Sequence, residues 1–549
     1  MSKRTTESLE KIRFHSRRIV KRAVYSRLLL IAVLVFIQIF LIVWLYRSLG
    51  SPATEIVQIS TSFIGILLVI FIVNRDIDPA FKLTWIIPMI ALPVFGVPLY
   101  FAVHSNLGAR RARRRVTEEI RETKHFIRPD RALLAEMRET APVAAALAVY
   151  AENVGYSTAY RSVGATYYES GEAMYQAMTD AIERAKNFVF LEFFILDEGN
   201  LWDGLLELLY RKVQEGVEVR LMYDGIGSLF KIPARYEKTL TKAGIETRVF
   251  CPVRPVFSTE QNNRDHRKIV VVDGTVAFTG GMNIADEYVN VRSRFGQWKD
   301  AGVSVGGKAA RAFTLLFLQS WNTAGNVRTQ DDYGRYLDDP WNEADEPDAA
   351  QAGNRTEKSG DDAGEASSGY CIPLADNPMD NEQIIETAYI SMLANAKSYV
   401  HIITPYLILD SKLTNALTSA AKRGVDVSII LPHIPDKKAA FAIARSHYPE
   451  LLAAGVTLYE YTPGFVHAKT FVSDGGTAIV GTSNLDFRSL YLHFECAAYF
   501  RDDAIARDVE RDFRETVKAS HRVTMKDYDD LTDWERFSGN VLRLFGPLM

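Results

Sequence analysis

The sequence contains few cysteines and little net charge, and both shortages narrow the class of protein. Its 549 residues include three cysteines, which are widely spaced and odd in number. They form neither a disulfide framework nor a CxxC pattern of the kind that binds zinc, which indicates a reducing compartment. Lysine and arginine total 64 against 67 acidic residues, a net charge of −3. So balanced a chain does not predict a surface that binds polyanions along its whole length.

Biased composition is also absent from the chain as a whole. Hydrophobic residues make up 48% of the chain and charged residues 24%, which is typical of globular proteins and excludes a disordered or collagen-like chain. The length predicts about three to five units of roughly 100–200 residues. These averages conceal an uneven distribution, with a membrane end, two similar segments and an acidic connector.

Three uncharged apolar runs lie close together near the N-terminus. Leu28–Tyr46 has 19 residues, enough to cross a bilayer as a helix, and Ile56–Val73 adds 18 residues with several polar ones among them. Leu83–Val103 has 21 residues, but three prolines at intervals of five positions interrupt it. Because each proline removes a helical hydrogen bond, this third run predicts a kinked span or a re-entrant hairpin.

Positive charges flank the apolar runs on both sides. Residues 1–27 contain nine lysines and arginines, and five arginines follow the third run between positions 110 and 115. Both clusters favour the cytoplasmic side, and two cytoplasmic ends require an even number of crossings. We therefore expect a multi-pass protein with two spans, a re-entrant third run and a cytoplasmic catalytic part. Three full spans, with the soluble part outside, are the alternative. The arginine cluster also suits anionic membrane lipid.

The rest of the chain repeats itself. "AKNFVFLEFFI" at Ala185–Ile195 parallels "AKSYVHIITPY" at Ala396–Tyr406, and two further pairs of segments match at offsets of 208 and 211. Each copy alternates short apolar runs with amphipathic helical stretches, such as Trp202–Glu215 and Leu413–Arg423. This alternation predicts an α/β layered unit with a largely buried sheet. Between the copies, residues 338–368 contain ten acidic and two basic residues, which predicts a disordered linker.

Together these patterns divide the chain into six segments. They are a basic leader, 1–27; a membrane region, 28–104; a basic juxtamembrane connector, 105–150; a first repeat, 151–332; an acidic linker, 333–369; and a second repeat, 370–549.

One segment of each repeat carries chemically active side chains. It reads "DHRKIVVVDGTVAFTGGMN" in the first repeat and "VHAKTFVSDGGTAIVGTSN" in the second, and five positions correspond at a constant offset of 201. These are His266, Lys268, Asp273, Gly280 and Asn283 in the first repeat, and His467, Lys469, Asp474, Gly481 and Asn484 in the second. Because side chains alternate along a strand, His-x-Lys places an imidazole and an ammonium on one face. Two such units related by a pseudo-twofold axis would bring both sets to one point.

Such a set of side chains suits a phosphoryl group. Lysine and asparagine supply donors for the non-bridging oxygens, where charge accumulates in the transition state. One histidine can attack phosphorus, while the other protonates the leaving alkoxide and later deprotonates the acceptor. A phosphodiester would then be cleaved through a covalent phosphohistidine, so we expect neither a metal ion nor another cofactor.

The duplicated motif resembles that of the phospholipase D superfamily, from about residue 150 to the C-terminus. The resemblance implies two α/β sandwich repeats with pseudo-twofold symmetry that share one active site. It carries the motif residues onto His266, Lys268, Asn283, His467, Lys469 and Asn484, with the two asparagines binding phosphate. Asp273 and Asp474 are carried over as further catalytic candidates, although the motif aspartate is mainly structural in the family. A further acid orients each histidine there, and the matching positions are Asp300 and Glu495, 34 and 28 residues after the histidine of their own copy.

Further segments are similar to those of bacterial cardiolipin synthases. They are "LPVFGVPLYFAVHSNLGARRARRR" after the apolar runs, "HRKIVVVDG", "GGMNIADEY" and "TSNLDFRS". This similarity implies an enzyme of the bacterial plasma membrane that transfers a phosphatidyl group between two phosphatidylglycerol molecules. By family analogy His266 is the nucleophile and His467 the acid and base, and the pseudo-symmetry leaves the reverse open. Asp265 stands where asparagine is usual, a position from which it could raise the pKa of His266.

Other activities use the same site and change the acceptor or the substrate. A phospholipase D hydrolase would use water, and another phosphatidyltransferase would use serine or a different alcohol. A membrane-tethered nuclease should show a basic groove with interleaved aromatic residues. Because the soluble part is not visibly basic, we expect no nucleic-acid partner. A scaffold without activity is disfavoured because every catalytic position is present in both copies, and the sequence leaves the oligomeric state open.

Overall fold

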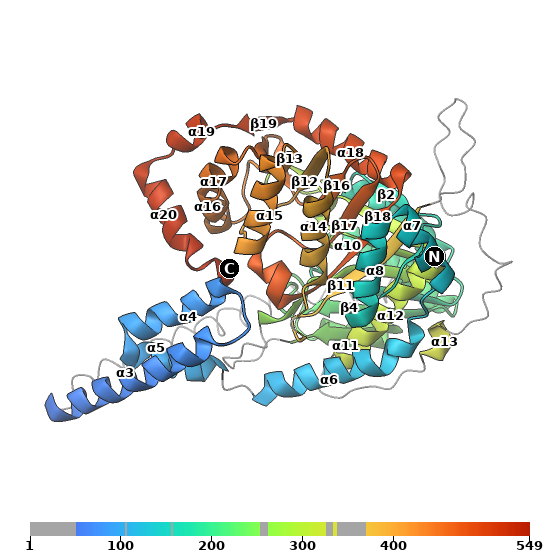
Figure 1. Ribbon diagram of the computed structural model, residues 1–549. Coiled ribbons are helices and arrows are strands. Elements are labelled where there is room, and N and C mark those ends of the chain that lie inside the picture. The colour runs from blue at the N-terminus through green and yellow to red at the C-terminus, as the bar shows by residue number, and fades with distance from the viewer. Residues whose placement is uncertain are drawn as a thin grey trace.

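The computed structural model describes residues 51–104, 107–154, 157–252, 262–324, 333–337, 369–380 and 382–548. The first apolar run, Leu28–Tyr46, and the acidic stretch at 338–368 lie outside these ranges, so both predictions stay open. Two β-sheets with helices on their outer faces form the body of the protein, and a group of helices near the N-terminus extends from it (Figure 1).

The first repeat contains a seven-stranded sheet with the order β2-β10-β8-β7-β3-β4-β5. Its strands are β2 Thr166–Tyr168, β3 Phe188–Phe193, β4 Glu218–Asp224, β5 Ile245–Phe250, β7 Lys268–Val272, β8 Val276–Gly280 and β10 Gly302–Gly306. β3, β4 and β5 are parallel, and β7 pairs antiparallel with both β3 and β8. Every residue of β3 is buried, because α9 (Gly171–Glu183) and α10 (Asn200–Gln214) cover one face and α12 (Gly307–Thr323) the other.

The second repeat follows the same plan. The path through its sheet is β1-β11-β18-β17-β16-β12-β13-β14-β19. The strands are β1 Tyr160–Arg161, β11 Tyr370–Asp376, β12 Tyr399–Ile403, β13 Asp426–Pro432, β14 Thr457–Tyr461, β16 Thr470–Ser473, β17 Thr477–Gly481, β18 His493–Arg501 and β19 Ser520–Val523. β12, β13 and β14 form the parallel set, and β16 pairs antiparallel with β12 and β17. The repeated α/β unit that the sequence predicts is therefore present twice.

The remaining helices surround these sheets (Figure 1). They are α6 Leu107–Thr123, α7 Arg131–Thr140, α8 Pro142–Val154, α11 Tyr236–Lys242, α13 Gly334–Leu337, α14 Ile384–Asn395, α15 Ser411–Lys422, α16 Lys438–Ser446, α17 Tyr448–Ala453, α18 Asp503–Lys518, α19 Met525–Asp529 and α20 Asp533–Arg543. The predicted amphipathic stretches are found as α10 and α15. α6 carries the arginine cluster and packs against α12, with Arg110, Arg111 and Arg113 exposed.

The two repeats share their hydrophobic core. One buried apolar cluster contains side chains of both sheets, among them Phe190 and Ile269 from the first and Phe471 and Ile479 from the second. β1 adds to this connection, because its residues precede the first sheet in the chain but pair with β11 of the second. The strand at Tyr160–Arg161 thus belongs structurally with the second repeat, although the sequence placed it in the first.

Two short parallel strand pairs cross between the repeats. β6 (Arg264–Asp265) pairs with the start of β18, and β15 (Gly464–Val466) pairs with β9 (Gln297–Lys299). β6 ends one residue before His266, and β15 ends one residue before His467. Each motif histidine therefore follows a strand that is hydrogen-bonded to the other repeat.

The second apolar run is a single long helix. α3 (Ser51–Val73) includes Glu55–Val73, which is the one helix of the described residues with the length and apolar composition to cross a membrane. Only 11% of its apolar window is buried, and large side chains such as Ile59 and Phe63 are exposed. An exposed apolar surface of this kind is suited to lipid.

The third apolar run is divided into two helices at its central proline. α4 (Pro79–Ala91) ends before Leu92, and α5 (Pro93–His104) returns beside it, with both packed against α3. A side chain at Gly96 would bring its Cβ to 2.6 Å from the carbonyl oxygen of Pro88, so this close approach requires glycine. With 13 and 12 residues, each helix is shorter than the ~20 residues that cross a bilayer. The run therefore forms a helical hairpin, and its re-entrant placement in a membrane stays a prediction.

Candidate active site

Each motif histidine lies beside the acid of the other repeat. Nδ1 of His266 is 2.9 Å from Oε1 of Glu495, and Nδ1 of His467 is 2.8 Å from Oδ2 of Asp300. All four side chains are buried. By sequence position, each acid follows the histidine of its own copy, whereas the structure pairs them across the two repeats.

The crossed strand pairs explain this exchange. The backbone N–H of His266 donates to the carbonyl of Phe494 at 2.9 Å, and that of His467 donates to the carbonyl of Lys299 at 2.6 Å. Phe494 and Lys299 directly precede the two acids. Parallel pairing with the other repeat thus fixes each histidine next to an acid that is distant in the sequence.

Each motif lysine lies two residues after its histidine, at the start of β7 (Lys268) or directly before β16 (Lys469). Nζ of Lys268 donates to the carbonyl of His266 at 2.5 Å, and Nζ of Lys469 donates to the carbonyl of His467. Burial lowers the pKa of Lys268 to about 8 and that of Lys469 to about 7, and the charge of Lys268 contributes at Lys469. Two close, buried ammonium groups favour an anion between them.

Burial also lowers the pKa of both histidines. The pKa of His266 lies well below its usual value, and the charge of Lys268 adds to the effect of burial. The pKa of His467 falls to about 4 through burial and Lys469, while Asp300 opposes the decrease. Burial thus favours the neutral form of the imidazole, the form that can act as a nucleophile, at both positions, while Asp300 favours a proton on His467.

The pKa values of the two orienting acids are shifted in opposite directions. Burial raises the pKa of Glu495 well above its usual value. Burial acts on Asp300 in the same direction, but the attraction and hydrogen bond of His467 outweigh it and lower the pKa of this carboxyl. Burial therefore disfavours the ionised form of Glu495, whereas the contact with His467 favours the ionised form of Asp300.

The residues packed against the two acids differ as well. Gly281 and Thr482 occupy equivalent positions, directly after the strands β8 and β17. A Cβ at Gly281 would overlap the carboxylate of Asp300, so this position requires glycine. The hydroxyl of Thr482 donates to Glu495 instead. The two copies of the motif are thus equivalent in sequence, but the groups that contact their acids are not.

The rings packed against the two histidines also differ. Against His467 lie Tyr288 and Trp298, with ring centroids 5.2 and 5.3 Å away. Against His266 lie Phe194 at 4.9 Å and a third histidine, His493, at 5.3 Å. His493 is not among the residues that the motif predicts. Its signal is the spacing in "HFE", which places His493 and Glu495 on one face of β18.

The two motif asparagines are buried in the loops that follow β8 and β17. The amide nitrogen of Asn283 donates to the hydroxyl of Tyr288 at 2.8 Å, and its oxygen accepts from the backbone of Ile195. Asn484 donates to Asp486 and Ser489, and its oxygen has no partner among the described residues. These bonds orient both loops at the site, and binding of phosphate by the amides stays a prediction.

Asp273 and Asp474 lie at the opposite end of their strands from the lysines. Each follows the last residue of β7 or β16 with a left-handed backbone, φ 52° and 51°. Asp273 accepts from the backbone N–H groups of residues 186–188, and Asp474 from those of 397–399. The structure does not bring these two catalytic candidates to the histidines; they fix the starts of β3 and β12.

Asp265 does not have the effect on His266 that its position suggested. Its carboxylate accepts from the backbone of Arg267, and burial raises its own pKa to about 6. The pKa of His266 is lowered, because burial and the charge of Lys268 dominate it. Asp265 instead interacts with the buried Glu192, whose pKa burial also raises.

One group of side chains in the described residues has the spacing of metal ligands. Ligand atoms of His266, His493 and Glu495 lie within 4.8 Å of one another, and all three residues are buried. A metal ion there would compete with His266 for the carboxyl of Glu495. The phosphohistidine chemistry predicted from the sequence assigns no step to such an ion, and its absence from the reaction stays a prediction.

Comparisons with known proteins agree with this architecture. A family model described as the PLD-like domain of cardiolipin synthase matches residues 178–293 and 389–517. A protein of Bacillus anthracis named cardiolipin synthase 2 is 32% identical over 88% of this chain and 89% of its own length. The cardiolipin synthase of Alkalihalophilus pseudofirmus is also 32% identical, over 95% of this chain and 98% of its own.

A further relative and a solved structure extend the comparison. An uncharacterised protein of Streptococcus mutans is 41% identical over 88% of this chain and 99% of its own. The crystal structure of a phosphatidylserine synthase from Haemophilus influenzae superposes with a TM-score of 0.50 and 16% identity, over 70% of this chain and 92% of that one. At that identity the likeness shows the fold alone.

Proposed function

Because the chain belongs to the cardiolipin synthase family of phospholipase D-like phosphatidyltransferases, we propose that it joins two phosphatidylglycerol molecules into cardiolipin and glycerol. The crossed pairing of histidines and acids is the observation that supports this most strongly. Each catalytic imidazole depends on an acid of the other repeat. The two repeats therefore provide a single site with two histidines, the number that a double displacement requires.

In the first step, His266 attacks the phosphorus of one phosphatidylglycerol. Its Nδ1 is occupied by Glu495, which leaves Nε2 free for phosphorus. The P–N bond forms as the bond from phosphorus to the glycerol oxygen breaks. His467 in its protonated form gives its proton to the departing oxygen, and the ionised Asp300 stabilises the imidazolium that this role needs.

In the second step, a hydroxyl of another phosphatidylglycerol attacks the phosphohistidine. His467 takes the proton of that hydroxyl, and the P–N bond to His266 breaks as the new P–O bond forms. Lys268 and Lys469 stabilise the charge on the non-bridging oxygens, and Asn283 and Asn484 complete the phosphate site. The different environments of the two histidines support this assignment of roles over the reverse.

We propose that the protein is anchored in the membrane by several passes of its apolar N-terminal region. We assign spans to Leu28–Tyr46 and to α3, and treat the hairpin of α4 and α5 as re-entrant. The soluble part then lies in the cytoplasm of a bacterial cell, with the arginines of α6 near anionic headgroups. The six segments keep the boundaries given above, with Tyr160–Arg161 as a strand donated to the second repeat.

Mass spectrometry of the lipids formed from pure phosphatidylglycerol by the purified protein tests the proposed function. We expect cardiolipin and glycerol in equal amounts, with activity that persists in a chelator. Phosphatidic acid as the sole product would indicate a hydrolase, and transfer to serine in preference to phosphatidylglycerol would indicate a different phosphatidyltransferase. Cleavage of nucleic acid without lipid turnover would indicate a nuclease.

A further inference from the structure

The α-helix nearest the C-terminus, α20, presents an apolar face that the rest of the described chain leaves uncovered. Trp534, Phe537 and Val541 recur at the spacing of one helix face, and Leu544, the C-cap residue, continues that spacing. All four side chains are exposed, with Trp534 at 72% and Phe537 at 58%. The rings of Trp534 and Phe537 lie side by side, with centroids 5.9 Å apart. A contiguous apolar surface of this kind marks a site of interaction.

The helix is held with this face outward. A capping box fixes its first turn: the backbone N–H of Glu535 donates to the hydroxyl of Thr532 at 3.2 Å, and the N–H of Thr532 donates to the carboxylate of Glu535 at 2.9 Å. At about 100° per residue, Gly539 lies on the face opposite the aromatic rings. Gly539 is buried, and a Cβ there would come within 2.7 Å of the carbonyl oxygen of Ala442 in α16. Close packing on α16 therefore fixes the orientation of the helix.

α20 and the N-terminal helices meet on one apolar cluster of the second repeat. The buried members of this cluster are Ile408, Ala440, Ile443 and Phe487. Phe81 of α4 and Leu542 of α20 both pack against it. The ring of Phe81 also lies edge-to-face with Phe487 and Tyr491, with centroids 5.6 Å away in both cases. The helices that we assign to the membrane and α20 are thus docked on the same region of the catalytic body.

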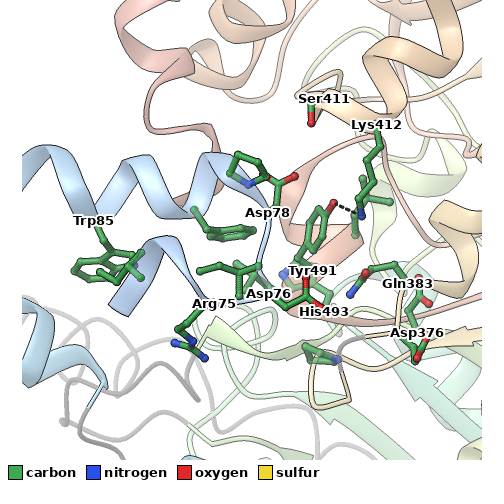
Figure 2. Close-up of a pocket in the computed structure, with 18 of the residues that line it drawn as sticks. Arg75, Asp76, Asp78, Trp85, Asp376, Gln383, Ser411, Lys412, Tyr491 and His493 are labelled. Atoms are coloured by element: carbon green, nitrogen blue, oxygen red, sulfur yellow. Dashed lines mark hydrogen bonds between the residues drawn. The ribbon is translucent and has the colours of Figure 1, made fainter. Parts of the chain in front are cut away.

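This region is also close to the catalytic histidines. A cavity of about 620 Å³ lies between the N-terminal helices and the second repeat, with Trp85 on one side and Tyr491 and His493 on the other (Figure 2). The ring of His493 is 5.3 Å from that of His266. Figure 1 shows α20 at the side of the body from which α3, α4 and α5 extend. A bilayer that contains α3 therefore lies on the side of the body that carries α20.

The composition of α20 suits the surface of a bilayer. Tryptophan is enriched at the level of the lipid headgroups, and a helix with one apolar and one polar face lies in that region parallel to the surface. The charges of α20 are balanced, with two acids and two arginines, so apolar side chains rather than attraction to anionic lipid would hold it there. Nearby, Leu83 and Ile87 of α4 are exposed as well. A second copy of the chain would have to reach the face of α20 beside these lipid-facing side chains.

We propose that the apolar face of α20 lies in the headgroup region of the bilayer that α3 enters and fixes the tilt of the catalytic body on it. The inference rests on the proposed membrane anchoring and goes beyond it, because an anchor alone does not set this tilt. Phe487, in the cluster below α20, follows the motif residue Asn484 by three positions. The contact would therefore hold the proposed phosphate site toward the surface from which both lipids come.

A fluorescent label on α20 tests its contact with lipid in the full-length protein. Cys251→Ser leaves two native thiols, Cys371 and Cys496, which are buried. Phe537→Cys then carries an environment-sensitive fluorophore, and the protein is reconstituted in vesicles of phosphatidylcholine and phosphatidylglycerol. We expect a blue shift of the emission and a loss of fluorescence when the vesicles contain lipid with a nitroxide near the headgroup. The matched control is Glu515→Cys, an exposed position of α18, which Figure 1 shows away from the N-terminal helices. It should show neither effect.

Turnover of two forms of the substrate tests the effect on tilt. In the double variant Trp534→Ser and Phe537→Ser, we expect the rate with phosphatidylglycerol in vesicles to fall about tenfold, because two large apolar side chains no longer enter lipid. The rate with short-chain phosphatidylglycerol dissolved as monomers should stay unchanged, since that substrate needs no surface. Glu515→Ser should alter neither rate.

The outcomes separate this inference from the proposed function. The fluorescence requires no turnover, so a labelled α20 that contacts lipid in a protein that forms no cardiolipin would overturn the proposed function alone. An unshifted emission, or a blue shift without quenching by the nitroxide lipid, would overturn the lipid contact, and the second result would assign the face to protein. An equal loss of rate with both forms of the substrate would overturn the role in tilt.

Discussion

The two halves of the active site have the same motif and different surroundings. His467 faces an ionised Asp300, a glycine and a wall of aromatic rings. His266 faces Glu495, whose pKa burial raises, together with a third histidine that lines a cavity; the hydroxyl of Thr482 contacts Glu495. Burial lowers the pKa of both imidazoles, but only at His467 does an acid oppose the decrease and favour a positive charge.

This difference explains how two copies of one motif can act as nucleophile and as general acid. A nucleophile must be neutral, and a general acid must carry a proton, so a symmetric pair would serve neither step well. The sequence motif is symmetric at five positions, but its neighbours are not. We therefore assign the roles from the residues around the motif.

Removal of either histidine has the largest expected effect and tests the asymmetry directly. His266→Ala and His467→Ala should each lower cardiolipin formation by about 10⁴-fold or more, because one site uses both. With an activated donor lipid whose leaving group is nitrophenolate, no proton is needed on departure. His467→Ala should then still release a burst of nitrophenolate, and His266→Ala should not. An equal burst in both variants would contradict the assignment of roles.

The two acids should differ in importance. Asp300→Asn removes a charge that stabilises the imidazolium of His467, and we expect a loss in kcat of about 10³–10⁴-fold. Glu495→Gln replaces a carboxyl whose ionised form is disfavoured by burial with a neutral amide of the same shape, and we expect a loss of about tenfold or less. Steady-state kinetics of both variants gives the comparison. Equal losses in kcat would contradict this difference between the two acids.

The two lysines should limit activity at alkaline pH. Each is charged below its pKa, which is about 7 for Lys469 and about 8 for Lys268, and loses its charge as the pH rises through that value. The value of kcat/KM should therefore fall above about pH 7, with Lys469 responsible for the first decrease. Arginine keeps its charge, so Lys469→Arg should move this decrease to higher pH. A profile that does not move would assign the decrease to another group.

The motif aspartates should behave alike in the two repeats and have the smallest effect on chemistry. Asp273→Asn and Asp474→Asn each weaken three bonds to backbone N–H groups. We expect the free energy of unfolding to fall by about 1–3 kcal/mol in each variant, with kcat nearly unchanged. Thermal unfolding in detergent and kinetics on the folded fraction check this. A large loss of kcat without a loss of stability would restore a catalytic role.

Much of the fold could be predicted from the sequence because it is periodic and duplicated. The alternation of apolar runs and amphipathic helices predicted both α/β units, and the proline spacing predicted a break in the third apolar run. The His-x-Lys spacing predicted which side chains share a face. These features are local or repeated, so they can be recognised in a single sequence.

The crossed pairing and His493 could not be predicted in the same way. Which acid contacts His266 depends on the pairing of β6 with β18, a contact between residues more than 200 positions apart. The motif also predicted Asp273 and Asp474 as catalytic candidates together with the lysines. In the structure, the aspartates lie at the opposite end of their strands from the lysines. Tertiary contacts, rather than the local pattern, decide these points.

The site of the covalent intermediate tests the central claim most directly. The protein is mixed with phosphatidylglycerol, quenched in alkali to preserve phosphohistidine, and digested, and the modified peptide is identified by mass spectrometry. We predict a phosphatidyl group on His266 in the wild-type protein and none on His467. A phosphatidyl group on His467, or turnover without any modified histidine, would contradict the account.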